Sequence, residues 1–238
     1  KGQNRERRCV MGEFFSTVPS LLLAAAVAYL LGALPLADQV SRRHGVDIFS
    51  VGTGLAGASN VRRSVGRFSG LLVLIGDLGK GAAAVIFAGF IGVDGTWAVV
   101  AVIAVVVGHW KSVFTGFQGG DGLTPLGGAV MALFPVFGLV AVAVALVVAL
   151  GGQLLPYTSL LSVVFGYLTL VTMTIAFEGD TALALGIGGV SGLVLAHALL
   201  GHRRRNSAAA DGVWEGATVS GEWEEIPDAD GVADRSGP

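Results

Sequence analysis

Long apolar runs separated by short polar segments occupy most of the first 200 positions of the chain. A membrane span needs about 20 apolar residues at about 1.5 Å rise each. The run 123–150 is too long for one upright span and contains Pro135, whose missing N–H and ring favour a break. We therefore expect that run to form a hairpin of two shorter helices, which brings the total to seven segments. The other five expected spans are residues 18–37, 68–91, 97–109, 158–177 and 181–200.

The distribution of Lys and Arg predicts the orientation of these segments, because short loops rich in these residues stay in the cytoplasm. Five arginines follow the first span, between residues 42 and 67. Alternation through seven segments then places Lys111 and the arginines at 203–205 inside, and Asp94 outside. The N-terminus is thus expected outside and the C-terminus in the cytoplasm. The basic residues before Met11 would then lie outside, which does not fit the rule that Lys and Arg stay in the cytoplasm. We therefore interpret residues 1–10 as an upstream extension.

Composition agrees with a membrane protein. The chain is 53% hydrophobic and 13% charged, with a mean hydropathy of +0.73, which is more apolar than a soluble domain of this length. The predicted fold is an all-α integral membrane protein with about seven transmembrane helices, a short hairpin around Pro135 and cytoplasmic glycine-rich loops. The single cysteine, Cys9, offers no ligand set for a cysteine-bound metal, and we expect neither a metal nor a nucleic-acid partner.

Three regions are predicted along the chain. Residues 1–13 form an N-terminal extension and residues 14–202 form the polytopic membrane domain. Residues 203–238 are acidic and rich in Ala, Gly and Ser, which is typical of a disordered cytoplasmic tail.

Glycine-rich segments between the apolar runs are the first candidates for a binding site. They are residues 51–60, the pair Gly108-His109 and residues 119–122. Glycines let successive N–H groups converge on an anion, so these segments indicate that phosphate is bound at a bilayer surface. The glycines at 188 and 192 have the spacing of helix packing instead.

Three polar residues lie within or at the ends of apolar runs. Asp77 and Lys80 are three positions apart on one helical face. Charges inside a membrane are costly, so they mark either a site or a simple ion pair. His109 ends an apolar run, where it could act as a general base or be an interfacial histidine without chemical function.

The order of these motifs resembles the PlsY-type acyl-phosphate:glycerol-3-phosphate acyltransferases. The resemblance rests on Gly32-Ala33-Leu34-Pro35, on residues 51–60, on Asp77-Leu78-Gly79-Lys80-Gly81 and on residues 108–122. It implies a multi-pass protein of the bacterial inner membrane that moves a fatty acyl group from acyl phosphate to the sn-1 hydroxyl of glycerol 3-phosphate. The expected product is lysophosphatidic acid, formed without acyl-CoA, cofactor, metal or covalent acyl-enzyme. Membrane lipids are the other expected partners.

The resemblance and the residue pattern together assign candidate roles. His109 and Asn60 are the candidate catalytic residues, and Asp77 and Lys80 are expected to organise the pocket between the loops. The candidate ligands of substrate phosphate are Gly52, Thr53, Gly54, Gly57, Ser59, Arg62, Lys111, Gly119 and Gly120.

Three positions depart from the motifs of that family. Ala33 replaces a serine, Leu55 an asparagine and Asp121 a lysine. They favour an alternative function, in which a non-catalytic relative or a small transporter binds a phosphorylated lipid or metabolite. Lys111, which is unusual for the motif, could supply the cation that Asp121 removes.

Overall fold

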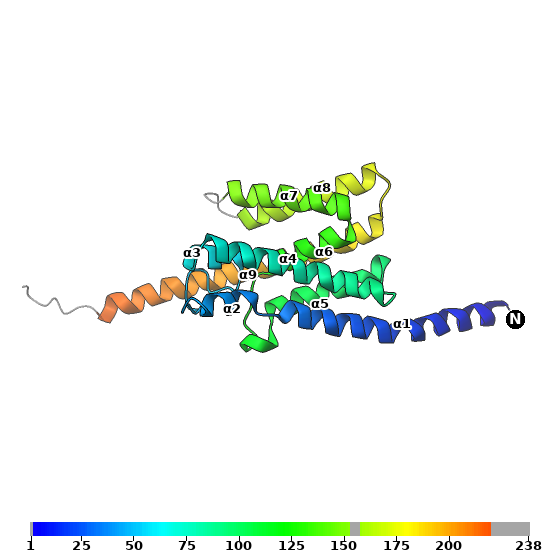
Figure 1. The fold of residues 1–238 in the computed structure, drawn as a ribbon, viewed down its shortest axis with the longest axis horizontal. Coiled ribbons are helices and arrows are strands. Elements are labelled where there is room, and N and C mark those ends of the chain that lie inside the picture. Colours follow the sequence, from blue (N-terminus) through cyan, green and yellow to red (C-terminus); the bar gives the residue numbers. More distant parts are fainter. Residues whose placement is uncertain (1, 153–157, 220–238) are drawn as a thin grey trace, which may run out of the picture. The chain divides into compact units, whose positions relative to one another are not determined.

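The computed structural model describes the backbone of residues 2–152 and 158–219, and the side chains of residues 17–152 and 158–200. Within these ranges all regular secondary structure is helical, which confirms the predicted all-α class. Figure 1 shows the helices, which are α1 (Gly2–Ala33), α2 (Leu36–Arg42), α3 (Ala58–Ser64), α4 (Arg67–Phe90), η1 (Gly95–Ala98), α5 (Val99–Trp110), η2 (Val113–Thr115), α6 (Leu123–Leu133), α7 (Pro135–Gly151), α8 (Thr158–Ala176) and α9 (Thr181–Val219).

Five helical stretches are long and apolar enough to cross a membrane: Thr17–Arg42, Arg67–Phe90, Gly95–Thr115, Thr158–Ala176 and Thr181–Leu200. The run 123–150 is divided as expected, because α6 ends at Leu133 and Pro135 begins α7. Proline suits the first turn of a helix, where its missing N–H leaves no bond unmade. Because α6 and α7 are shorter than the other spans, the count of seven crossings stays a prediction.

The chain divides into a unit of residues 1–199, which contains every site discussed below, and a unit of residues 200–238. Helix α9 continues to Val219, where we predicted disorder from residue 203. Residues 208–210 are all alanine, the residue with the highest helix propensity. Residues 220–238 lie outside the described part of the chain, as does most of the turn at 151–157, and the domain boundaries stay predictions.

Glycines allow the helices of the first unit to touch backbone to backbone. Helix α1 packs along α5, and α4 along α6 (Figure 1). A Cβ atom on Gly32 or Gly108 would overlap a carbonyl oxygen of the partner helix in the α1 and α5 pair, and one on Gly81 or Gly128 would do so in the α4 and α6 pair. In lipid, where apolar side chains gain little from leaving the solvent, such close packing holds helices together.

Two glycines of α4 provide a matched test of this packing. Gly81 lies against the carbonyl of Pro125, whereas Gly79 has no neighbour within 4 Å on its Cβ side. We expect Gly81→Ala to lower the free energy of unfolding by about 1–3 kcal/mol through overpacking. Gly79→Ala should leave it unchanged or raise it slightly, because alanine favours a helix. Equal thermal stabilities of the two variants in detergent would contradict the packing argument.

Candidate functional site

A small polar pocket lies where the turn after α1 meets the middle of α4 and the end of α5. Asp77 and Lys80 line it from α4. Lys80 Nζ lies 3.0 Å from Asp77 Oδ1, with both side chains almost completely buried. The same Nζ donates to the carbonyl oxygen of Leu34 at 3.2 Å. The pair thus neutralises its charges inside an apolar helix and also ties α4 to the turn after α1.

The pair retains hydrogen-bonding capacity. Asp77 Oδ2 is buried and has no hydrogen-bond partner among the described residues. An ammonium group has three N–H donors, and the two contacts given above use two of those on Lys80. One acceptor and one donor can therefore face a ligand in the pocket.

His109 completes the polar lining from the end of α5. Its side chain is buried, and its carbonyl oxygen accepts a hydrogen bond of 3.1 Å from the N–H of Gly120. A Cβ atom on Gly120 would overlap the ring at Nε2, so only glycine allows the loop to lie against the imidazole. The pocket has a volume of about 10 Å³, which is about the room of one water molecule.

The glycine-rich segment at 51–60 folds around the amide of Asn60. The two N–H groups of the amide Nδ2 are shared among the carbonyl oxygens of Ile48, Val51 and Leu55, which lie at 3.2, 3.1 and 3.0 Å. Its Oδ1 accepts from the N–H of Thr53 at 3.3 Å. Asn60 is 1% exposed, and its contacts hold the loop together rather than reaching into the pocket.

The glycines of this loop allow its backbone to adopt the fold around Asn60. Gly52 has φ +58° and Gly54 has φ +65°, a region in which side chains are strained, and a Cβ on Gly52 would overlap Asn60 Oδ1. The N–H groups of Gly54 and Gly57 donate to carbonyls of their own loop. This segment is therefore a turn closed by its own hydrogen bonds, and its role in binding phosphate stays a prediction.

The two glycine-rich loops meet in a backbone contact. The N–H of Ala56 donates to the carbonyl of Gly119 at 3.1 Å, and a Cβ on Gly120 would lie 2.6 Å from the carbonyl oxygen of Ala56. Trp110 holds the next residue of the second loop, because its Nε1 donates to the carbonyl of Asp121 at 2.7 Å. We call this contact of residues 56–57 with 119–121 the backbone wall.

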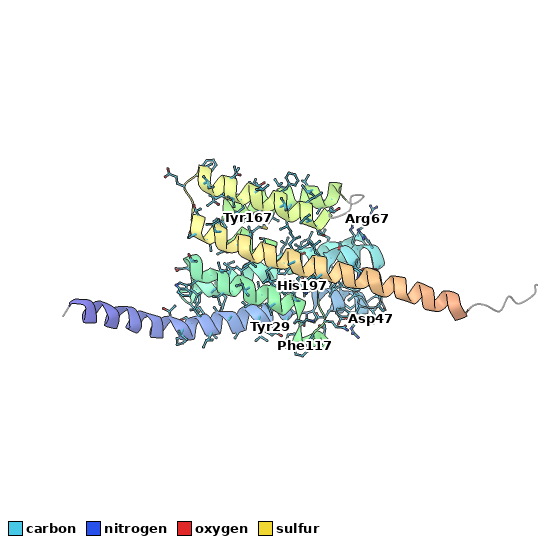
Figure 2. The ribbon with its side chains drawn as sticks, turned by 180° about the vertical axis from the view of Figure 1, so that it is seen from behind. Tyr29, Asp47, Arg67, Phe117, Tyr167 and His197 are labelled. Atoms are coloured by element: carbon cyan, nitrogen blue, oxygen red, sulfur yellow. The ribbon has the colours of Figure 1, made fainter. Side chains whose placement is uncertain are left out.

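A large groove of about 580 Å³ lies on the other side of the backbone wall. Ala56 and Gly120 line the polar pocket, whereas the next residues, Gly57 and Asp121, line the groove. Apolar side chains of α4, α6, α7, α8 and α9 form most of its surface. Figure 2 labels two of its lining residues, Arg67 at the start of α4 and Tyr167 within α8.

One end of the groove is basic. Arg62, Arg63 and Arg67 line it there, together with the hydroxyl residues Ser59 and Thr158. We call these three arginines the basic rim. An apolar groove with a cationic end matches a molecule that has a hydrocarbon chain and an anionic head.

Comparison with known proteins agrees with this geometry. The family model described as "Glycerol-3-phosphate acyltransferase" matches residues 22–209, well over half of the chain. The chain belongs to the glycerol-3-phosphate acyltransferase family.

Several bacterial members of the family are similar to this chain. A glycerol-3-phosphate acyltransferase of Deinococcus radiodurans is 43% identical over 118 residues, which is 50% of this chain and 60% of that protein. One of Rubrobacter xylanophilus is 40% identical over 144 residues, covering 60% of this chain and 70% of that protein. The alignment thus spans about three fifths of the length of the Deinococcus relative.

Two solved structures share the fold. Both are crystal structures of PlsY (YgiH), an integral membrane glycerol 3-phosphate acyltransferase, in its glycerol 3-phosphate form and its lysophosphatidic acid form. The TM-scores are 0.64 and 0.62, at 28% and 27% identity, covering 81% of this chain and 93% of that chain. Family and fold together make this chain a multi-pass protein of the bacterial inner membrane.

The structure sorts the candidate residues of this acyltransferase family member into three groups. The polar pocket brings together Asp77, Lys80, His109, Gly119 and Gly120. The groove receives Gly57, Ser59 and Arg62. The residues that line neither cavity are Gly52, Thr53, Gly54, Asn60 and Lys111.

The positions of the Lys111 and Asp121 side chains differ from those that their considered roles require. The side chain of Lys111 is exposed, so it does not supply the pocket with a cation in this conformation. Asp121 Oδ1 accepts from the N–H of Leu123 at 3.1 Å, at the start of α6, where a carboxylate stabilises the first turn. Asp121 therefore has a structural role here, in addition to lining the groove.

Sequence reasoning missed Ser112. Its hydroxyl donates to the carbonyl of Ala33 at 2.6 Å and accepts from the N–H of Phe114 at 3.2 Å. Ser112 is buried and lines the polar pocket. The Ser112 hydroxyl thus lies beside position 33, one of the three departures noted in the sequence, but it comes from the loop after α5.

Proposed function

We propose that this protein transfers a fatty acyl group from acyl phosphate to the sn-1 hydroxyl of glycerol 3-phosphate, and so forms lysophosphatidic acid for phospholipid synthesis. The observation that carries the proposal is the pair of cavities on either side of the backbone wall. Glycerol 3-phosphate can occupy the polar pocket and acyl phosphate the apolar groove, with the reacting end of each substrate near the backbone wall. Such placement is a large part of catalysis for a reactant that is already activated.

The acyl donor fits the groove. Its hydrocarbon chain would lie among the helices and its phosphate at the basic rim, where Arg62, Arg63 and Arg67 supply charge-assisted hydrogen bonds. Glycerol 3-phosphate would bind in the polar pocket beside Lys80 and His109. The pocket must widen for this ligand, and the loop at 112–121, joined to the first loop by the Ala56 to Gly119 hydrogen bond, is the segment that would move.

The chemistry requires few side chains. The sn-1 hydroxyl oxygen attacks the acyl carbon, the bond between that carbon and the phosphate oxygen breaks, and inorganic phosphate leaves. The hydroxyl proton passes to a base, for which His109 is our candidate. Acyl phosphate is a mixed anhydride, so neither a nucleophile nor a cofactor is required to activate it. Asn60 and Ser112 act as positioning residues for the two loops.

An acyltransferase function is favoured over the alternative, in which the protein binds a phosphorylated lipid or metabolite without turnover. Family membership supports it. In the fold the departures at 33 and 121 have local explanations, because the Ser112 hydroxyl donates to the Ala33 carbonyl and Asp121 Oδ1 accepts from the N–H of Leu123 at the start of α6.

Purified protein given palmitoyl phosphate and glycerol 3-phosphate should release lysophosphatidic acid. We expect Lys80→Met to lower the rate by about a hundredfold or more, which corresponds to the loss of one charge-assisted hydrogen bond of about 3 kcal/mol. The doubly neutral variant Asp77→Asn/Lys80→Met should recover thermal stability, because it leaves no buried unpaired charge, but not activity. Absence of product from the native protein would contradict acyl transfer, and full activity in the double variant would exclude a binding role for Lys80.

The orientation belongs to the same proposal. With seven crossings, both glycine-rich loops face the cytoplasm, where glycerol 3-phosphate is found, and the N-terminus lies outside. A reporter that is active only outside the cytoplasm should be silent when fused after Arg205 and active when inserted near Asp94. The reverse pattern would overturn this orientation.

A further inference from the structure

The groove has a closed end opposite the basic rim. Four side chains from four helices line it there and are almost completely buried: Val130 of α6 at 7% exposed, Ala141 of α7 at 3%, Leu170 of α8 at 1% and Ile187 of α9 at 1%. We call these four residues the floor. The four floor side chains are apolar, which suits the methyl end of a hydrocarbon chain, and the polar residues nearest to them in the lining are Tyr167 and Ser191, one turn from Leu170 and Ile187.

The backbone below the floor keeps it closed. Helices α6 and α7 join at Phe134 and Pro135, and a Cβ on Gly138 would overlap the carbonyl oxygen of Val130. The start of α7 therefore lies directly on the end of α6. This contact between α6 and α7 closes the groove beside Val130 and Ala141.

The length of the groove matches a fatty acyl chain. From Thr158 at the rim to Leu170 at the floor, α8 advances by about 18 Å at about 1.5 Å per residue. One leaflet of a bilayer core is roughly 15 Å thick, half of the roughly 30 Å hydrocarbon core. The depth, the basic rim and the apolar walls indicate one occupant, a single-chain lipid with a phosphate head.

From these observations we infer that the floor formed by Val130, Ala141, Leu170 and Ile187 limits the length of the acyl chain that the protein accepts. The identity of the occupant as the acyl donor rests on the proposed function, whereas the length limit rests on the closed end of the groove. Val130 and Leu170 are specificity-determining residues in this view, because both belong to the floor and come from different helices, α6 and α8.

Matched substitutions test the inference. Val130→Phe fills the floor, and Val147→Phe makes the same change on the outer face of α7, where Val147 is 70% exposed and does not line the groove. Leu170→Ala deepens the floor, and Leu168→Ala makes the same change at a lipid-facing position of α8. In each pair, a difference between the groove variant and its control therefore reports a change in the groove and not a general effect on the helix.

The probes are decyl, tetradecyl and octadecyl phosphate, which have no acyl carbonyl and cannot be turned over. Their binding to the purified full chain is measured by thermal stabilisation in one detergent. Each methylene excluded from a buried position should weaken binding by about fourfold, from ~0.8 kcal/mol per CH₂. Val130→Phe should therefore weaken the binding of octadecyl phosphate by about tenfold or more relative to Val147→Phe, and leave the binding of decyl phosphate unchanged. Leu170→Ala should shift the binding preference toward longer chains.

Identical chain-length profiles in each variant and its control would overturn the inference, as would failure of every alkyl phosphate to stabilise the native protein. If Val130→Phe does not fold, Leu170→Ala still tests the floor in the opposite direction. The binding assay is independent of turnover. A shifted chain-length profile without lysophosphatidic acid formation would support the length limit and refute acyl transfer. Lysophosphatidic acid formation with unshifted profiles would support acyl transfer and refute the length limit.

Discussion

Close backbone contact at glycine is the constraint on which the rest of the structure depends. In a bilayer, helices gain little by hiding apolar side chains from lipid, so they associate through packing at short range. Gly32 and Gly108 bring α1 against α5, and Gly81 and Gly128 bring α4 against α6. Because α1 also packs against α4, these contacts place the end of α5 and the middle of α4 around one point.

The polar groups of the pocket depend on this close packing. Two charges inside an apolar helix are costly unless they are paired and bonded. Lys80 meets this requirement through Asp77 and the carbonyl of Leu34, and it can reach that carbonyl only because the turn after α1 is held next to α4. Gly120 extends the same principle to the loops, because the absence of a side chain lets the backbone wall lie against His109.

Much of the fold was predictable from local sequence, and the site only in part. Apolar runs and Pro135 predicted the long helices and the division between α6 and α7, because hydropathy and a missing N–H act locally. Asp77, Lys80 and His109 were recognised as candidates because charge or polarity in an apolar run is costly wherever the chain places it. The glycines at 52 and 54 are assigned to phosphate by their spacing, which stays a prediction. In the fold Gly52 lies against the amide of Asn60 and Gly54 against the carbonyl of Phe49, and a pattern of glycines does not distinguish a ligand site from a tight turn.

The groove could not be predicted, because its walls come from residues more than a hundred positions apart in six helices. No local pattern shows that Val130 and Ile187 line the same groove. The contact of Ser112 with Ala33 was hidden for the same reason, since 79 positions separate the two residues and only the packing of α1 on α5 brings them together.

Under the proposed function, the two cavities on either side of the backbone wall hold the two substrates. The most direct measurement is an experimental structure of the protein with both glycerol 3-phosphate and hexadecyl phosphate bound. We expect the glycerol 3-phosphate beside Lys80 and His109, the second phosphate at the basic rim, and the alkyl chain in the groove with its end near Val130. An alkyl chain on the outer surface of the helices, or both phosphates in one cavity, would contradict the account.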